Sequence, residues 1–185
     1  MRIIAGQWRG RKIRTPAGDT TRPTADRVRE TLFSMVTSRL GSFDELSVLD
    51  LFAGSGALGL EALSRGAERC TFVEHDRPAI DVLRANIALL DAGARTEVRS
   101  SSALALGPAL KPFDVVMMDP PYGSGAGSVA LDKLGWLGWF SPSCWISVET
   151  GSRETVAVSG FTVEAERIVG KAKLTILRPA ADVLE

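Results

Sequence analysis

Residues that bind metal ions or form cross-links are scarce in this sequence. It contains one histidine, His75, and two cysteines, Cys70 and Cys144, which lie far apart in apolar stretches. Their spacing matches no common arrangement of metal ligands, so we expect no metal site. We interpret Cys70 and Cys144 as buried thiols on strands, which is the ordinary state of cysteine in a reducing cytosol.

Long hydrophobic runs are also missing. No apolar run approaches the roughly 18 residues of a membrane span, and residues 1–6 do not begin a secretory signal. The 185 residues, of which 45% are hydrophobic and 24% are charged, suit one folded domain with its own core. We therefore expect a soluble cytoplasmic protein.

The formal net charge is zero, because 22 lysine and arginine residues balance 22 aspartate and glutamate residues. This balance by itself gives no indication of a nucleic-acid partner. Residues 1–29 nevertheless contain eight basic and two acidic side chains, a net charge of +6, which leaves −6 on residues 30–185. The N-terminal segment is therefore a candidate for binding phosphate groups.

The N-terminal residues predict a small basic hairpin followed by a helix. Two short strands, residues 2–5 and 11–15, flank a turn at residues 7–10. A helix is predicted over residues 25–40, with Thr24 as its N-cap. The predicted division of the chain is a basic extension over residues 1–23 and a sheet domain over residues 24–185.

From residue 47 onward, short apolar runs alternate with segments of helical periodicity, which is typical of a parallel sheet with crossover helices. Strands are predicted at residues 48–52, 70–74, 97–99, 113–118 and 145–149. Helices are predicted at residues 57–65, 77–90 and 129–137, and an antiparallel hairpin at residues 162–169 and 173–178. The predicted fold class is α/β, a Rossmann-like, mostly parallel, doubly wound sheet with an antiparallel C-terminal hairpin.

A glycine-rich segment follows the first predicted strand of the sheet. Gly54 and Gly56 come directly after the strand that contains Asp50, at the start of a predicted helix. Glycines in this position allow a sharp turn and a close approach of a ligand to the helix N-terminus. With Gly59 the segment also satisfies the dinucleotide fingerprint, so by itself it does not identify the cofactor.

Glu74 ends the second predicted strand, 18 residues after Gly56. A carboxylate at this position can accept hydrogen bonds from both hydroxyls of a ribose. Asp76 is interpreted as the N-cap of the next helix, and His75 as an exposed or packing residue. We therefore predict that Glu74 binds the ribose of a nucleoside cofactor.

The segment Asp119-Pro120-Pro121-Tyr122 directly follows an apolar strand. Prolines lack amide donors and fix the backbone, so the Asp119 carboxylate and the Pro120 carbonyl become two rigid acceptors beside an aromatic ring. Such acceptors suit the exocyclic NH2 group of a nucleobase, where they would localise the lone pair and stabilise charge during attack on a methyl donor. Tyr122 would stack on the base. Asp119, Pro120 and Tyr122 are thus the predicted catalytic residues.

These motifs together resemble S-adenosylmethionine-dependent methyltransferases that act on amino groups of nucleic acids. The N-terminal motifs narrow the resemblance to the RsmD family; they are Arg2-Ile3-Ile4-Ala5-Gly6, Arg9-Gly10-Arg11 and Thr21-Arg22-Pro23-Thr24-x-Asp26-Arg27-Val28-Arg29-Glu30. The resemblance runs from residue 1 to about residue 178. It implies a methyltransferase domain over residues 24–185 that methylates N2 of one guanine in 16S ribosomal RNA, within a 30S subunit or an assembly intermediate.

The resemblance also implies the layout of the cofactor site. The glycine turn would hold the methionine end of S-adenosylmethionine with Thr24 beside it, and Glu74 would hold the ribose. Where the family usually has Asp or Asn for the adenine amino group, this chain has Ser102 followed by Ala103, and a serine hydroxyl is a shorter and weaker partner. The predicted cofactor-binding residues are Thr24, Asp50, Phe52, Ala53, Gly54, Ser55, Gly56, Glu74, Ser102, Ala103 and Asp119.

The basic N-terminal extension then becomes the candidate RNA-binding surface. Phosphate contacts supply most of the non-specific affinity for nucleic acid, and Trp8 is an aromatic residue interleaved with cations, a pattern typical of nucleic-acid binding. The last hairpin adds two lysines. The predicted RNA-binding residues are Arg2, Trp8, Arg9, Arg11, Lys12, Arg14, Arg22, Lys171 and Lys173.

Three other functions are compatible with parts of the sequence. An adenine-N6 methyltransferase acting on DNA or RNA would use the same acceptors, because the geometry at Asp119 suits either amine. A dinucleotide-dependent oxidoreductase would use the glycine turn, but it leaves residues 119–122 unexplained. A non-catalytic RNA-binding module would need only the basic extension.

Overall fold

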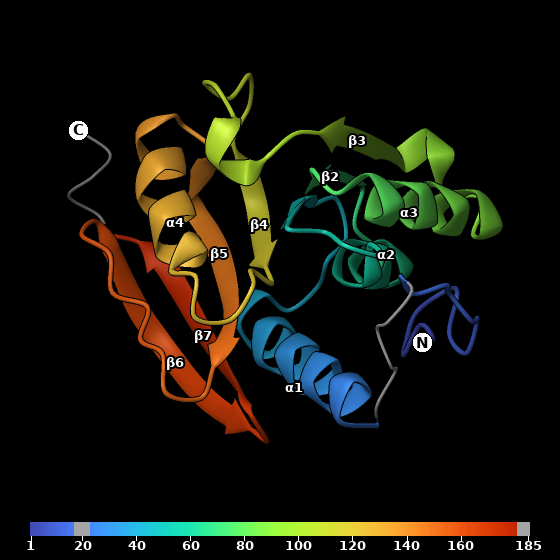
Figure 1. Ribbon diagram of the computed structural model, residues 1–185, viewed down its shortest axis with the longest axis horizontal. Helices are drawn as coiled ribbons and strands as arrows, with labels where there is room; N and C mark the ends of the chain where they lie inside the picture. The colour runs from blue at the N-terminus through green and yellow to red at the C-terminus, as the bar shows by residue number, and fades with distance from the viewer. Residues whose placement is uncertain (17–22, 181–185) are drawn as a thin grey trace.

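Seven strands form one mixed sheet in the computed structural model, which describes residues 1–16 and 23–180, with side chains for 1–16 and 25–180 (Figure 1). Their order across the sheet is β3-β2-β1-β4-β5-β7-β6. The strands are β1 (Ser47–Leu51), β2 (Arg69–Glu74), β3 (Thr96–Ser100), β4 (Phe113–Met118), β5 (Phe140–Gly151), β6 (Phe161–Val169) and β7 (Ala172–Pro179). Strands β1 to β5 pair in parallel, whereas β7 is antiparallel to both β5 and β6. The predicted sheet with an antiparallel C-terminal hairpin is confirmed.

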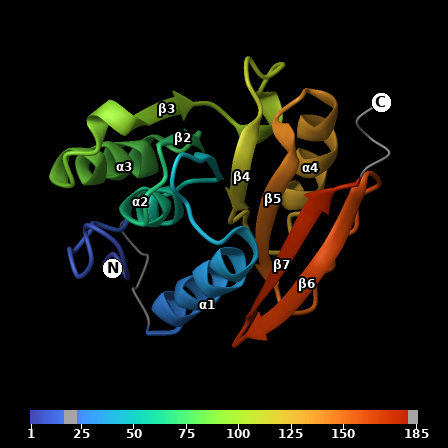
Figure 2. The same cartoon turned by 180° about the vertical axis from the view of Figure 1, so that it is seen from behind.

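Helices cover both faces of this sheet. They are α1 (Pro23–Leu40), α2 (Ala57–Ser64), α3 (Arg77–Leu89) and α4 (Ala126–Trp136), with short 3-10 turns at Gly93–Arg95 and Ala103–Ala105. Leu32 of α1 and Leu83 of α3 belong to the core cluster on one face, and Leu131 of α4 belongs to the cluster on the other. Helix α4 lies in front of β5 in Figure 1 and behind it in Figure 2. Met117 and Met118 of β4 contribute to opposite clusters, as expected for a strand buried on both faces.

Most predicted boundaries agree with the structure to within two residues, and the two exceptions have local causes. Strand β5 begins at Phe140 rather than at residue 145, because the β4–β5 ladder shifts register between Phe113 and Val115 and continues past a Ser-Pro-Ser break. Helix α4 begins at Ala126 rather than at residue 129. Gly125 adopts a left-handed conformation before it, and the N–H of Ala126 donates to the hydroxyl of Ser124.

The first sixteen residues reverse direction as predicted, but they do not form the two predicted strands. A single antiparallel bridge joins Arg2 and Lys12. The ladder ends there because the N–H groups of Ile4 and Ala5 donate to the carboxylate of Glu61 on α2, at 2.8 and 2.9 Å. The N-terminal segment is thus held by α2, beside which it lies in both views (Figures 1 and 2).

Cys70 on β2 and Cys144 on β5 are both free and buried, as the sequence predicts. Among the described residues, no helix is long and apolar enough to cross a membrane. The same part of the chain contains no group of three or more His, Cys, Asp or Glu side chains that could hold a metal ion.

Candidate active site

The strand order reverses between β1 and β4, which is the position at which ligands bind in open α/β sheets. From β1 the chain continues outward through β2 and β3, whereas β4 and β5 build the other half of the sheet. A cavity of about 520 Å³ lies at the carboxyl ends of these strands. Its lining joins separate chain segments, with Arg29 from α1, Asp50 and Phe52 from the end of β1, Asp119 after β4 and Glu149 on β5.

The turn after β1 requires glycine at several points. Gly54 and Gly56 have positive φ angles of 54° and 79°, and Phe52 also has a positive φ of 61°. A Cβ atom on Gly59 would lie 2.4 Å from the Phe72 ring, so any larger residue would push α2 away from β2. The glycines therefore serve both the sharp turn at the cavity and the close packing of the helix on the sheet.

Asp50 has hydrogen-bonding capacity that the described residues leave unused. Its side chain lines the cavity and is only 1% exposed. Oδ2 accepts a hydrogen bond from the N–H of Gly59 at 2.8 Å, whereas Oδ1 is buried with no partner among the described residues. Burial raises the pKa of Asp50 to about 8, the charge of Glu74 adds to this effect, and the Gly59 N–H opposes it.

Three backbone N–H groups hold the carboxylate of Glu74. Oε2 accepts from Gly54 at 2.9 Å, and Oε1 accepts from His75 and Asp76 at 2.8 and 2.9 Å. Glu74 is buried and lies outside the lining of the 520 Å³ cavity. Its contact with Gly54 joins the end of β2 to the glycine turn. Asp76 caps α3, as predicted, by accepting from the N–H of Ala79 at 3.1 Å.

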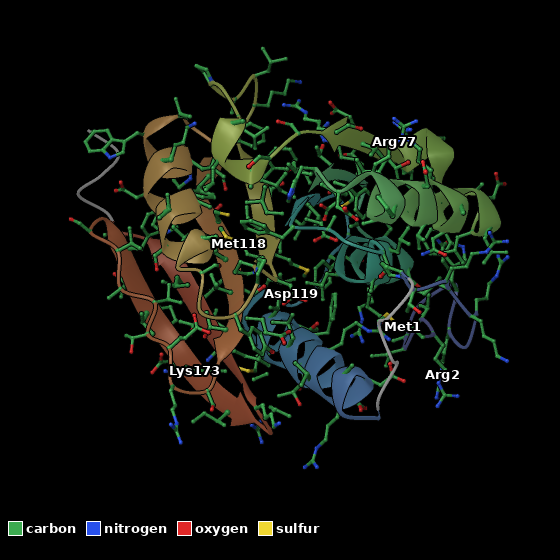
Figure 3. The ribbon with its side chains drawn as sticks, in the orientation of Figure 1. Met1, Arg2, Arg77, Met118, Asp119 and Lys173 are labelled. Carbon is green, nitrogen blue, oxygen red and sulfur yellow. The ribbon has the colours of Figure 1, made fainter. Side chains whose placement is uncertain are left out.

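The segment that begins at Asp119 leaves the end of β4 at the cavity, above α1 in Figure 3. Asp119 is exposed, Pro120 is buried, and Tyr122 is half-exposed. The hydroxyl of Tyr122 donates to Oε1 of Glu149 at 2.6 Å. Burial, together with this hydrogen bond and the neighbouring carboxylate charges, raises the pKa of Tyr122, so its hydroxyl remains a donor. The aromatic ring is therefore tethered at the cavity rather than free to swing away.

Glu149 is a site residue that the sequence analysis did not single out. Met118, the last residue of β4, pairs with Val148 of β5, and Asp119 and Glu149 directly follow this pair. Both residues line the cavity. Burial raises the pKa of Glu149, and the hydrogen bond from Tyr122 acts in the opposite direction. The only sequence signal for Glu149 was its place at the end of the fifth predicted strand.

Two further polar residues that the sequence did not identify hold the N-terminal segment in place. Glu61 on α2 is fully buried and, besides its contacts to this segment, pairs with Arg65 at 2.9 Å. Asn86 on α3 is also fully buried. Its Oδ1 accepts from the N–H of Arg14 at 2.7 Å, and its Nδ2 donates to the carbonyls of Arg14 and Ser55 at 3.0 and 2.9 Å. Asn86 thereby links the N-terminal segment to the glycine turn.

Trp8 requires a correction. The ring is 9% exposed, belongs to the core cluster under α1 to α3, and has the guanidinium of Arg95 5.2 Å from its centre. A ring packed in this way is not available to stack on an RNA base. The indole gains more from burial in the core than from exposure among the neighbouring cations, so Trp8 is a packing residue and not an RNA-binding one.

The other predicted RNA-binding residues differ in their surroundings. The cations of the N-terminal segment are exposed; they are Arg2, Arg9, Arg11, Lys12 and Arg14. Arg11 also donates to the carbonyl of Leu89 at 2.5 Å. Lys171 lines the cavity, while Lys173 pairs with Glu166 at 3.8 Å. Arg22 lies outside the described residues.

Four predicted cofactor-binding residues are not in the lining of the cavity, namely Gly56, Glu74, Ser102 and Ala103, and a fifth, Thr24, cannot be placed. The side chain of Thr24 is outside the described atoms, and because α1 begins at Pro23, Thr24 lies in its first turn rather than before it. Ser102 and Ala103 do not line the cavity. The Ser102 hydroxyl caps a short turn by accepting from the N–H of Leu104 at 3.2 Å. Their contact with an adenine ring stays a prediction.

Comparison with known proteins identifies the family. Residues 1–178 match the family described as conserved hypothetical protein 95. The chain is 38% identical over 173 residues to the ribosomal RNA small subunit methyltransferase D of Escherichia coli K12, a match that covers 92% of this chain and 86% of that protein. The chain belongs to the RsmD family. The namesake enzyme of Haemophilus influenzae is likewise 38% identical over 175 residues, which is 92% of this chain and 89% of that one.

Solved structures share the fold of this chain. YhhF from Escherichia coli, described as a methyltransferase, superposes with a TM-score of 0.83 at 38% identity and covers 98% of both chains. Magnesium protoporphyrin IX methyltransferase from Synechocystis, solved with bound SAM, shares the fold, with a TM-score of 0.68 at 13% identity over 88% of this chain and 87% of that one. The predicted RsmD family and Rossmann-like methyltransferase fold are confirmed.

Proposed function

We propose that this RsmD-family protein transfers a methyl group from S-adenosylmethionine to the N2 amino group of one guanine in 16S ribosomal RNA. The observation that supports this most directly is that Asp119 and the glycine turn line the same cavity. A methyl donor held at the turn and an amino group held at Asp119 would therefore meet in one space. The relatives named as ribosomal RNA small subunit methyltransferases support the choice of substrate.

The residues around the turn fit the proposed cofactor. Oδ1 of Asp50, which is buried and has no partner in the described part of the chain, suits the positively charged amino group of the methionine end. Gly54 and Ser55 line the cavity just before the N-terminus of α2, where backbone N–H groups favour a carboxylate. Glu74, already held by the turn, suits the ribose hydroxyls. S-adenosylmethionine, when bound, supplies an electrophilic methyl group.

Asp119 and Pro120 prepare the target amine for attack. The nitrogen of an exocyclic amino group is a weak nucleophile because its lone pair is delocalised into the base. Two N–H bonds donated to the Asp119 carboxylate and the Pro120 carbonyl favour a localised lone pair and stabilise the positive charge that develops on nitrogen. Tyr122, tethered to Glu149, supports the base by stacking. The proton is lost after methyl transfer.

The N-terminal residues 1–23 act as the RNA-contacting arm of the methyltransferase domain over residues 24–185. Their exposed cations are suited to phosphate groups, and Lys171 extends the positive surface to the cavity. The domain itself carries the net negative charge, so the arm provides the attraction for RNA. The substrate is 16S ribosomal RNA within a 30S subunit or an assembly intermediate, which places the enzyme in the cytoplasm.

Transfer of labelled methyl groups to 30S subunits from a strain that lacks the enzyme tests this function. Digestion of the product to nucleosides should yield N2-methylguanosine. If N6-methyladenosine were the sole product, the enzyme would be an adenine-N6 methyltransferase and not a guanine-N2 methyltransferase. Failure to label 30S subunits, partial particles and naked 16S ribosomal RNA alike would reject methylation of this RNA.

Cofactor binding is expected to release a proton from Asp50. A pKa of about 8 keeps this carboxyl mostly protonated at pH 7 in the free protein. A positive amino group within about 4–6 Å favours the ionised form and lowers the pKa, so binding releases up to about one proton. Calorimetric titration with S-adenosylhomocysteine in buffers of different ionisation enthalpy measures this release. Undiminished proton release by Asp50→Asn would contradict the assignment.

Removing two exposed cations of the arm is expected to weaken RNA binding alone. In the double variant Arg9→Ala with Lys12→Ala, the slope of log RNA affinity against log salt concentration should decrease by the amount expected for about two lost phosphate contacts. Affinity for S-adenosylhomocysteine should stay unchanged, because neither side chain lines the cavity. Exposed Lys111, on the loop before β4, provides a control, and Lys111→Ala should alter neither affinity. Equal losses of RNA and cofactor affinity in the double variant would argue against an arm that binds RNA.

A further inference from the structure

The carboxyl ends of β4 and β5 place two acidic residues side by side at the cavity. Met118 and Val148 are paired, so Asp119 and Glu149 follow on strands that run about 4.8 Å apart. Met118 and Val148 both point into the core cluster beneath α4. Because side chains alternate between faces along β5, Glu149 is directed to the opposite face, and there it lines the cavity together with Asp119.

Glu149 is held in a defined orientation but is not used in the methyl-transfer chemistry described above. Its Oε1 accepts the hydroxyl of Tyr122, while no hydrogen bond to Oε2 occurs among the described residues. The same Tyr122 follows Asp119 by three positions, so the tether couples the two acidic residues to the ring that supports the base. One oxygen of Glu149 thus remains as an acceptor at the cavity.

We propose that Glu149 selects guanine by accepting the N1–H of the target base while Asp119 accepts its N2 amino group. Guanine presents N1–H and the N2 amino group as adjacent donors on its Watson–Crick edge. Adenine presents its amino group beside an unprotonated N1, which would set a lone pair against the carboxylate oxygen. This inference rests on the proposed function and specifies how the same site distinguishes the base.

The charges of the two acidic residues favour the same conclusion. Adjacent carboxylates repel each other unless donors lie between them or nearby. The edge of guanine supplies a donor to each, whereas the edge of adenine supplies donors to Asp119 only and leaves Oε2 of Glu149 without a donor. A site built to accept a particular N–H group discriminates strongly against an analogue that lacks it, because its own polar group is then left unsatisfied.

2-Aminopurine tests the role of Glu149 directly, because it keeps the amino group to be methylated but lacks N1–H. We would measure kcat/KM on 30S subunits reconstituted with 16S ribosomal RNA that contains guanine or 2-aminopurine at the target position. The unsubstituted enzyme should prefer guanine. Glu149→Ala should lower kcat/KM on guanine by about 10- to 100-fold, and on 2-aminopurine only by the smaller factor that Tyr122→Phe also causes. Glu149→Gln, which keeps an acceptor oxygen, should restore part of the preference.

Tyr122→Phe is the matched control for a merely structural role. It removes the 2.6 Å hydrogen bond but keeps the ring and the Glu149 carboxylate. If Glu149 acted only by holding Tyr122, both variants would lower activity equally on the two bases, and the proposal would be overturned. It would also be overturned if Glu149→Ala kept the full preference for guanine. Thermal melting and S-adenosylhomocysteine affinity establish that each variant is folded.

The proposed function and the selection of guanine by Glu149 would be contradicted by different results. If the unsubstituted enzyme methylates no guanine in these subunits, the proposed function is wrong. If it produces N2-methylguanosine and its preference over 2-aminopurine survives the loss of Glu149, only the selection by Glu149 is wrong.

Discussion

Replacing Asp119 with alanine is expected to lower kcat for methyl transfer by about 10²- to 10³-fold, the usual effect of removing one group that stabilises a developing charge. The variant loses the carboxylate that accepts the target N–H at the end of β4. Affinity for S-adenosylhomocysteine should fall much less, because the glycine turn and Glu74 stay in place. Single-turnover kinetics and calorimetric titration measure the two effects separately.

Two further variants, Asp119→Asn and Asp114→Asn, test whether this result is specific to the Asp119 carboxylate. Asp119→Asn keeps one acceptor oxygen and should lose less activity than Asp119→Ala. Asp114 lies at the other end of β4, where its carboxylate accepts from the N–H and the hydroxyl of Ser47 at 2.9 and 2.7 Å. Asp114→Asn should therefore leave kcat unchanged. Nearly normal kcat in Asp119→Ala would exclude Asp119 from the chemistry.

Replacing Glu61 with alanine is expected to lower the free energy of unfolding by about 3–5 kcal/mol, the range for breaking one side of a buried ion pair. The fully buried carboxylate accepts from the N–H groups of Ile4 and Ala5 and pairs with Arg65. Without it, two backbone donors and a largely buried guanidinium lose their partner. Urea denaturation followed by circular dichroism measures the change.

An exposed glutamate close to Glu61 in the sequence provides the comparison. Glu68 precedes β2 and is exposed, so Glu68→Ala should change the free energy of unfolding by no more than about 0.5 kcal/mol. A similarly small change in Glu61→Ala would mean that the N-terminal segment is not held by this carboxylate. Glu61→Gln keeps an acceptor oxygen, so it should lower the free energy of unfolding by an amount between those for Glu68→Ala and Glu61→Ala.

Features that depend on the local chain were predictable from the sequence. Short apolar runs indicated strands because a strand buried on both faces has few polar positions. Gly54 and Gly56 indicated the turn because their backbone permits positive φ, which the structure has. Pro120 and Asp119 were recognised because proline limits the backbone wherever it occurs.

Features that depend on a distant partner were not predictable in the same way. Tyr122 and Glu149 are 27 residues apart, and Arg14 and Asn86 are 72 residues apart, yet each pair is joined by hydrogen bonds. Nothing in the neighbourhood of Glu149 or Asn86 in the sequence names these partners. Trp8 was misjudged for the same reason, since its neighbours in sequence are cations and its neighbours in space are core side chains.

The sequence by itself determined the family, the order of the elements and the residues whose backbone chemistry is special. Only the tertiary structure decided which carboxylates share the cavity, which cations of the arm are exposed, and which polar groups hold the arm to the domain. The physical reason is that composition and periodicity indicate which side of each segment is buried. Hydrogen bonds, pKa values and cavities depend instead on which segments distant in the chain pack together, whether paired strands or a helix and the N-terminal segment.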